Sequence, residues 1–252
     1  MKITFIGVGA ADDAFYPNVS LYVETSKAKI LMDCGTTVAF ELLKRKDILL
    51  NTDAIYISHR HGDHIFGLPI VLLKMKGFGR AKPLIIFGYK GFKEFILQTL
   101  RLGYSTMFDD LKKFPYSIEF IEIDPKEPKT ILGLEMQMAP TVHTEINYAL
   151  KITESGKSIV YSGDGSFTEQ GKNLYKGCDL LIHESFTIDE PVAGHAIVTD
   201  LIRLSKENGI KALALIHLRE SVRRNELPRL KKLIKKEKIN AFVPEPGTML
   251  VI

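Results

Sequence analysis

The sequence predicts an α/β fold in which two packed β-sheets carry helices on their outer faces, an αββα sandwich. About a dozen short runs of β-branched residues recur along the chain, too many for one doubly wound sheet. Helical patterns fall between some of these runs. No Ser/Gly-rich or Pro-rich linker and no internal repeat interrupts the 252 residues. We therefore expect a single domain, residues 1–252.

The strands are expected where β-branched residues concentrate over a span of strand length. In chain order the expected strands are Lys2 to Ile6, Ser20 to Glu24, Ile30 to Met32, Ala54 to Ser58, Leu84 to Phe87, Ile118 to Ile123, Leu134 to Ala139, Ala149 to Thr153, Ser158 to Tyr161, Leu180 to Ile182, Ala212 to Ile216 and Ala241 to Pro244. The first run passes into Gly7-Val8-Gly9, which is typical of a core strand and its turn and not of a signal peptide.

Four segments have apolar residues at helical spacing and recognisable ends. They are Pro69 to Lys76, Gly91 to Leu102, His195 to Lys206 and Leu227 to Lys236. Proline near the start and glycine just after the end are the usual helix boundaries, and several of these segments have one or the other.

The composition is that of an ordinary globular protein, with 45% hydrophobic and 25% charged residues. Two cysteines, Cys34 and Cys178, cannot make a disulfide framework and form no CxxC pair, so a reducing cytoplasmic location is expected. No apolar run approaches the length of a membrane span, and no membrane partner is expected. A net charge of +4 permits a polyanionic partner without requiring one.

The strongest chemical signal is the run His59-Arg60-His61-Gly62-Asp63-His64, which directly follows an apolar strand. His59 and His61 lie two residues apart and would project to the same side of an extended backbone, forming half of a metal site. Asp63 and His64 follow the flexible Gly62 and can turn toward a second ion. The motif therefore predicts a metal centre.

Further ligands are expected at the ends of later strands. His143, Asp164 and His217 each follow a predicted strand, where binding residues collect in α/β proteins. Together with the motif they would gather seven groups at one rim. The alternative is that these residues are separate surface or core side chains.

The motif resembles the signature of the metallo-β-lactamase superfamily, and its flanks look most like the ribonuclease Z group. The similar segments cover roughly residues 1 to 220: Gly7-Val8-Gly9, Pro17 to Ser20, Asp33 to Thr36, His61 to His64 with Gly67 to Pro69, Pro83 to Gly88 with Lys90-Gly91, and Leu180 to Glu184. The resemblance implies a hydrolase that attacks a phosphodiester with a hydroxide held by two divalent ions. Zn²⁺ is the expected metal, and Mn²⁺ and Fe²⁺ are the other candidates.

The resemblance also implies a role for each ligand. His59, His61 and His143 would hold the first ion, Asp63, His64 and His217 the second, and Asp164 would bridge them. Asp63, Glu184 and His195 are the expected catalytic residues, with Glu184 orienting His195 as general acid. The alternative for His195 is a helix-cap residue without catalytic duty. Asp33 is expected to steady a ligand from behind.

Two features depart from ribonuclease Z. Its members usually carry a transfer-RNA-gripping arm between the third histidine and the bridging aspartate, whereas only 20 residues separate His143 from Asp164. The segment beginning at His217 also lacks the expected serine. The predicted substrate is therefore either RNA or a small or cyclic phosphodiester. The basic and aromatic stretches Lys74 to Arg80 and Gly88 to Lys93 suit nucleic acid or are merely solvated loops.

Two other functions stay open. A thioester or lactone hydrolase would use the same metal pair, although Glu184 and His195 favour phosphorus chemistry. A nucleic-acid-binding protein with structural metals is less consistent with seven ligands for two ions, because coordination sites remain for water. The sequence also leaves open a homodimer.

Overall fold

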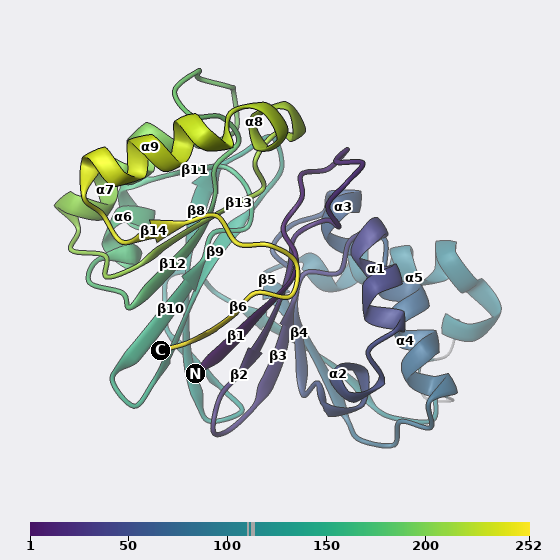
Figure 1. The fold of residues 1–252 in the computed structure, drawn as a ribbon. Helices are drawn as coiled ribbons and strands as arrows, with labels where there is room; N and C mark the ends of the chain where they lie inside the picture. Colours follow the sequence, from purple (N-terminus) through teal and green to yellow (C-terminus); the bar gives the residue numbers. More distant parts are fainter. Residues whose placement is uncertain (110, 112–113) are drawn as a thin grey trace.

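The computed structural model describes residues 1–109, 111 and 114–252. Two β-sheets pack together, and helices cover the outer face of each, as Figure 1 shows. The helices of the first half of the chain lie on one side and those of the second half on the other. This is the αββα arrangement that the sequence predicts.

The first sheet is built from the N-terminal half of the chain plus the last strand. Among the described residues its order is β15-β1-β2-β3-β4-β5-β6. The strands are β1 (Lys2–Gly7), β2 (Ser20–Glu24), β3 (Lys29–Met32), β4 (Ala54–Tyr56), β5 (Leu84–Tyr89), β6 (Ile118–Ile123) and β15 (Met249–Val251). Neighbours from β3 to β6 pair in parallel, and the other pairs are antiparallel.

The second sheet has the order β11-β8-β9-β10-β12-β13-β14, with β7 also paired to β8. Its strands are β7 (Lys129–Ile131), β8 (Leu134–Val142), β9 (Tyr148–Glu154), β10 (Lys157–Tyr161), β11 (Ser166–Phe167), β12 (Leu180–Glu184), β13 (Leu213–Ile216) and β14 (Ala241–Phe242). The sequence does not predict β7, β11 or β15, because two or three residues are too few to show a strand's alternation.

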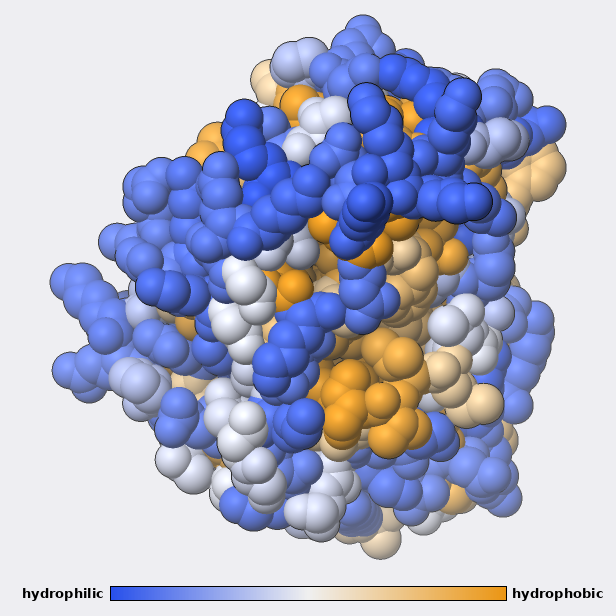
Figure 2. Space-filling view, turned by 60° about the vertical axis from the view of Figure 1, so that its left-hand side comes forward, coloured by the Kyte–Doolittle hydropathy of each residue, from blue (hydrophilic) through white to orange (hydrophobic). Residues whose placement is uncertain are grey.

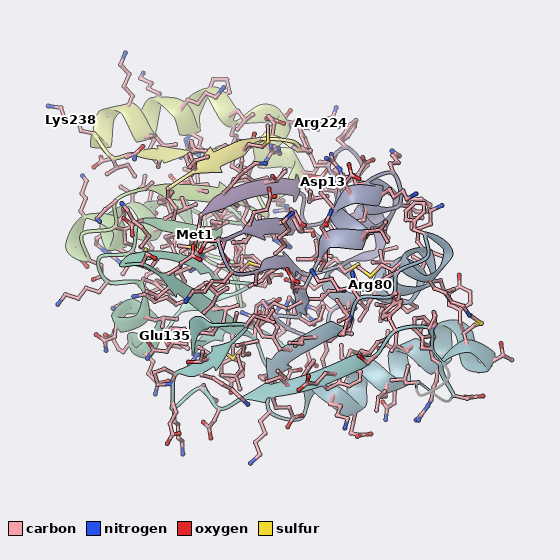
Figure 3. All side chains as sticks on the ribbon, turned by 90° about the horizontal axis from the view of Figure 1, so that it is seen from below. Met1, Asp13, Arg80, Glu135, Arg224 and Lys238 are labelled. Atoms are coloured by element: carbon pink, nitrogen blue, oxygen red, sulfur yellow. The ribbon has the colours of Figure 1, made fainter. Side chains whose placement is uncertain are left out.

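The helices next to the first sheet are α1 (Thr36–Leu43), α2 (Lys46–Asn51), α3 (Gly62–Ile65), α4 (Leu68–Gly77) and α5 (Phe92–Phe108). Those next to the second are α6 (Glu169–Tyr175), α7 (Val198–Glu207), α8 (Glu220–Asn225) and α9 (Leu227–Glu237). In Figure 3, the labelled Arg224 belongs to α8, and the labelled Lys238 is the C-cap of α9. None of the described helices is long and apolar enough to cross a membrane.

Two predicted helix boundaries are wrong. Helix α5 continues past Gly103 to Phe108, because a kink at Tyr104 (φ −151°, ψ 76°) lets the chain bend and bury Phe108. Helix α7 begins at Val198 and not at His195, since Ile197 is extended and acts as its N-cap.

The hydrophobic core has one layer between the sheets and one beneath each group of helices. The middle layer joins residues of both sheets, for example Phe87 with Ile152 and Ile182, all fully buried. Burial of each such side chain stabilises the fold by about 1.5–3 kcal/mol. In the space-filling view of Figure 2, hydrophobic side chains gather in one area and hydrophilic side chains cover most of the rest.

The strand directions place several strand ends at one rim. β10, β12 and β13 run parallel to one another. β8 runs in the same direction, because both β8 and β10 are antiparallel to β9. His143, Asp164, Glu184 and His217 come at or just after the carboxyl ends of these strands. The His59 loop, which follows β4 of the other sheet, meets them there.

Candidate metal centre

The structure brings the first predicted ligand group together. One ligand atom from each of His59, His61, His143 and Asp164 lies within 4.8 Å of every other. Nδ1 of His61 lies 3.1 Å from Nε2 of His59 and 3.1 Å from Nε2 of His143. His61 thus offers Nδ1, whereas its two neighbours offer Nε2.

The second group is assembled in the same way from Asp63, His64, Asp164 and His217. Nε2 of His64 lies 3.1 Å from Oδ2 of Asp63 and 3.4 Å from Oδ1 of Asp164. Nε2 of His217 lies 3.5 Å from Oδ2 of Asp63 and 3.3 Å from Oδ2 of Asp164. All seven predicted ligands therefore meet at one place.

Asp164 belongs to both groups, and its surroundings suit a cation. In the described part of the chain, Oδ1 of Asp164 and Nε2 of both His64 and His217 are buried without a hydrogen-bond partner. Unpaired buried polar atoms are rare in native proteins. Three such atoms converging on one spot are satisfied by a divalent ion, so this donor set fits the metals that the resemblance implies.

The other ring nitrogens of three histidines are held from behind. Nδ1 of His59 donates to Oγ of Ser58 at 3.0 Å, Nδ1 of His64 donates to Asp33 at 2.7 Å, and Nδ1 of His143 donates to the carbonyl of Gly194 at 2.8 Å. These contacts fix the tautomers, so that each Nε2 keeps its lone pair directed at the cluster.

Asp33 links the two sheets beneath the site. It is fully buried and has a positive φ of 57°. Oδ1 accepts from the backbone of Ser58 at 2.8 Å, and Oδ2 accepts from its hydroxyl at 2.6 Å and from the hydroxyl of Tyr161 at 2.6 Å. The expected supporting role of Asp33 is thus visible, whereas the part played by Tyr161 was not predicted.

Asn147 is a second supporting residue that the sequence did not indicate. Its buried amide nitrogen donates to the carbonyls of Ser162 and Asp164 at 2.9 and 2.6 Å and to the hydroxyl of Thr141 at 2.7 Å. These bonds hold the Gly163 turn that presents Asp164. The only signal in the sequence was the position of Asn147 four residues after the candidate ligand His143.

The surroundings shift the pKa values of the histidines in opposite directions. Burial and the neighbouring His64 hold the pKa of His59 well below its usual range. Burial alone would lower the pKa of His64 and His217, but the carboxylates of Asp164 and Asp63 raise both, that of His217 to about 9. Burial opposes ionisation of Asp63, yet His64 and His217 hold its pKa well below its usual range. The carboxylates therefore stay charged at neutral pH.

Glu184 and His195 border the cluster. Glu184 is fully buried, and its Oε1 lies 3.2 Å from Nδ1 of His195 and accepts the backbone N–H of Ala196 at 2.9 Å. The His195 ring stacks on Phe186 with centroids 4.3 Å apart and lies 5.5 Å from the His143 ring. His195 does not cap α7, because it lies two residues before the N-cap Ile197, and its catalytic role stays a prediction.

Among the other residues that the sequence singles out, Arg80 and the two cysteines are buried. Arg80, labelled in Figure 3, is 3% exposed and donates to backbone carbonyls such as those of Leu49 and Thr52, so it cannot be part of a nucleic-acid surface. Cys34 and Cys178 are buried and unpaired. The 20 residues between His143 and Asp164 form the hairpin β9–β10, in agreement with the missing arm.

Comparison with known proteins places this geometry in a family. The chain is 29% identical to the ribonuclease Z of Methanocaldococcus jannaschii, with 96% of this chain and 93% of that protein covered. It is 25% identical to the ribonuclease Z of Ignicoccus hospitalis, with coverage of 100% and 98%.

Solved structures show the same fold. The metallo-β-lactamase fold protein YhfI from Bacillus subtilis superposes with a TM-score of 0.80 and 25% identity, with 99% of this chain and 98% of that chain covered. The short form of human tRNase Z (ELAC1) superposes with a TM-score of 0.79 and 22% identity, with 100% and 99% covered. The predicted fold and the predicted likeness to ribonuclease Z are confirmed.

A family model described as "Anti-Pycsar protein Apyc1" matches residues 1–239. This match spans all seven candidate ligands and both Glu184 and His195. The chain therefore belongs to the Anti-Pycsar protein Apyc1 family and has the metallo-β-lactamase fold.

Proposed function

We propose that this protein is a metal-dependent phosphodiesterase whose site is the pair of donor clusters joined by Asp164. The observation that carries the proposal is the combination of this shared carboxylate with a buried Glu184–His195 pair at the edge of the same cluster. The similarity to ribonuclease Z proteins supports a phosphodiester as the bond that is cleaved.

The first ion would be held by His59, His61 and His143, the second by Asp63, His64 and His217, and Asp164 would serve both. Five imidazoles and two carboxylates favour Zn²⁺ and also suit Mn²⁺ or Fe²⁺. When bound, such a pair lowers the pKa of a water molecule and neutralises charge on the phosphodiester.

The chain's own residues supply the rest. Asp63 keeps its negative charge and can accept a hydrogen bond from the attacking water, orienting it. Glu184 engages Nδ1 of His195, which leaves Nε2 to deliver a proton to the leaving oxygen. Stacking on Phe186 keeps the His195 ring in this orientation.

For the substrate we propose a small phosphodiester and not a precursor transfer RNA. The tight hairpin β9–β10 occupies the place where an RNA-gripping arm would leave the fold, and Arg80 of the basic stretch is buried. The two buried, unpaired cysteines suit the reducing cytoplasmic location expected from the sequence.

The test is a panel of substrates offered to the metal-loaded protein: bis(p-nitrophenyl) phosphate, a cyclic nucleotide, a precursor transfer RNA and an aryl thioester. We expect kcat/KM for the cyclic nucleotide to exceed that for the thioester by at least about a hundredfold, because its alkyl leaving oxygen needs the proton that His195 can supply. The value for bis(p-nitrophenyl) phosphate should also exceed that for the thioester, because a two-metal site stabilises both the attacking and the leaving oxygen of a displacement at phosphorus. Faster thioester cleavage would replace the proposal with the acyl alternative, and selective cleavage of transfer RNA would overturn the small-substrate assignment.

A further inference from the structure

An ion pair joins the two loops that supply the histidines of the first cluster. Nε and Nη2 of Arg60 both donate to Oε2 of Glu145, at 3.1 and 2.7 Å. Arg60 stands between His59 and His61, and Glu145 follows His143 by two residues. The pair therefore connects a loop of the first sheet to a loop of the second.

Arg60 does not face the cluster itself. His59 and His61 direct ring nitrogens at the first donor group, whereas the guanidinium of Arg60, the residue between them, is engaged by Glu145. Its guanidinium lies 5.6 Å from the centre of the Phe95 ring, outside both donor groups. The side chains of Arg60 and Glu145 keep 41% and 36% of their surface exposed, so neither is part of the buried donor set.

Few other polar contacts tie these loops together. Among the described residues, the one other hydrogen-bond contact between residues 58–61 and 143–146 is that of His61 Nδ1 with His143 Nε2. Both nitrogens are ligand atoms, so a bound ion would take their lone pairs and that contact would cease to be a hydrogen bond. The Arg60–Glu145 pair would then be the remaining polar link.

We propose that Arg60 and Glu145 are positioning residues that hold His143 against His59 and His61 and thereby strengthen binding of the first ion. The inference rests on the metal centre of the proposed function. It is specific to the first cluster, because two ligands of the second have supports of their own: Nδ1 of His64 donates to Asp33, and the backbone N–H of His217 donates to the carbonyl of Val8.

The expected effect is modest. Exposed ion pairs contribute little and are screened by salt, so loss of the link should weaken the first ion's affinity by about twofold to fivefold at low ionic strength and less at high salt. The second ion's affinity should not change. This difference between the two ions separates positioning from a general loss of stability.

The experiment is a chelator-competition titration that resolves the two Zn²⁺ affinities of the full chain. Arg60→Ala, Glu145→Ala and the double variant should weaken the same ion to the same extent, and Arg60→Lys should restore part of the affinity. The matched control is Lys206→Ala with Glu237→Ala, a similarly exposed pair joining α7 and α9 at 2.6 Å, which should leave both affinities unchanged.

The positioning role and the metal centre are overturned by different results. Unchanged affinities in the Arg60 and Glu145 variants, or equal weakening of both ions, would overturn the positioning role while leaving the metal centre intact. A parent protein that takes up no Zn²⁺ at all would instead overturn the proposed function. Far-UV circular dichroism of each variant verifies that the fold is retained.

Discussion

Replacement of Asp33 by Asn tests how the protein sets the tautomer of His64. Oδ2 of Asp33 accepts three donors, from Ser58, His64 and Tyr161. An amide NH₂ at that place would donate where the carboxylate accepts. The hydroxyls can rotate, but Nδ1 of His64 would have to become an acceptor, which puts the proton on Nε2 and blocks its lone pair.

The size of the expected effect comes from other metal sites. Loss of the group that accepts a hydrogen bond from a metal-ligating histidine weakens metal binding about 10- to 100-fold, or about 1.4–2.7 kcal/mol. We expect Asp33→Asn to lose this much affinity for the second ion and to keep the first, as measured by competition titration with Zn²⁺. Tyr161→Phe is the control, since it removes one hydrogen bond to the Asp33 carboxylate, worth about 1.5–3 kcal/mol of folding stability, without removing the His64 contact. Equal metal affinities in Asp33→Asn and the parent would refute the tautomer argument.

Three further predictions concern protonation, pH and packing. His195→Ala should slow cleavage of alkyl phosphodiesters more than that of p-nitrophenyl esters, and equal slowing would remove its general-acid role. The carboxylates raise the pKa of His217 to about 9 against about 6.5 in the unfolded chain, so the metal-free protein should lose thermal stability as pH rises through 9. Zn²⁺ affinity should increase over the same pH range, because binding displaces that proton. A Zn²⁺ affinity that falls together with the thermal stability as pH rises would contradict the assignment of His217 to the site. Gly35→Ala should destabilise by about 1–3 kcal/mol in denaturant titrations, since its Cβ would lie 1.7 Å from the carbonyl oxygen of Asp63, whereas Gly77→Ala, with open space around it, should not.

The fold was predictable where the local pattern is strong. The longer strands lie where β-branched residues concentrate, because their side chains fill the layer between the sheets. Five short helices escaped prediction, and α1 shows why: its residues Val38, Ala39 and Leu42 are buried beneath the first sheet, but eight residues show too little helical periodicity. The kink at Tyr104 that lets α5 pass Gly103 depends on tertiary packing of Phe108, which no local pattern reveals.

The candidate site was predictable to the level of its ligands and not of their supports. The spacing of His59 to His64 and the positions after strands indicate which side chains meet. The hydrogen bonds of Tyr161, Asn147 and Glu145 join segments that are distant in the chain, so the residues next to them in the sequence do not reveal these contacts. The sequence likewise does not show that His61 directs Nδ1 at the cluster whereas His59 directs Nε2, because this depends on the conformation of the folded loop.

The proposed function depends on two ion sites that share the carboxylate of Asp164. Its most direct test is the zinc content of the purified chain by elemental analysis after equilibration with excess Zn²⁺ and desalting, beside that of Asp164→Ala. We expect about two ions per chain for the parent and fewer than about one for the variant, because both donor clusters lose a ligand. Two tightly held ions in Asp164→Ala, or none in the parent, would contradict it.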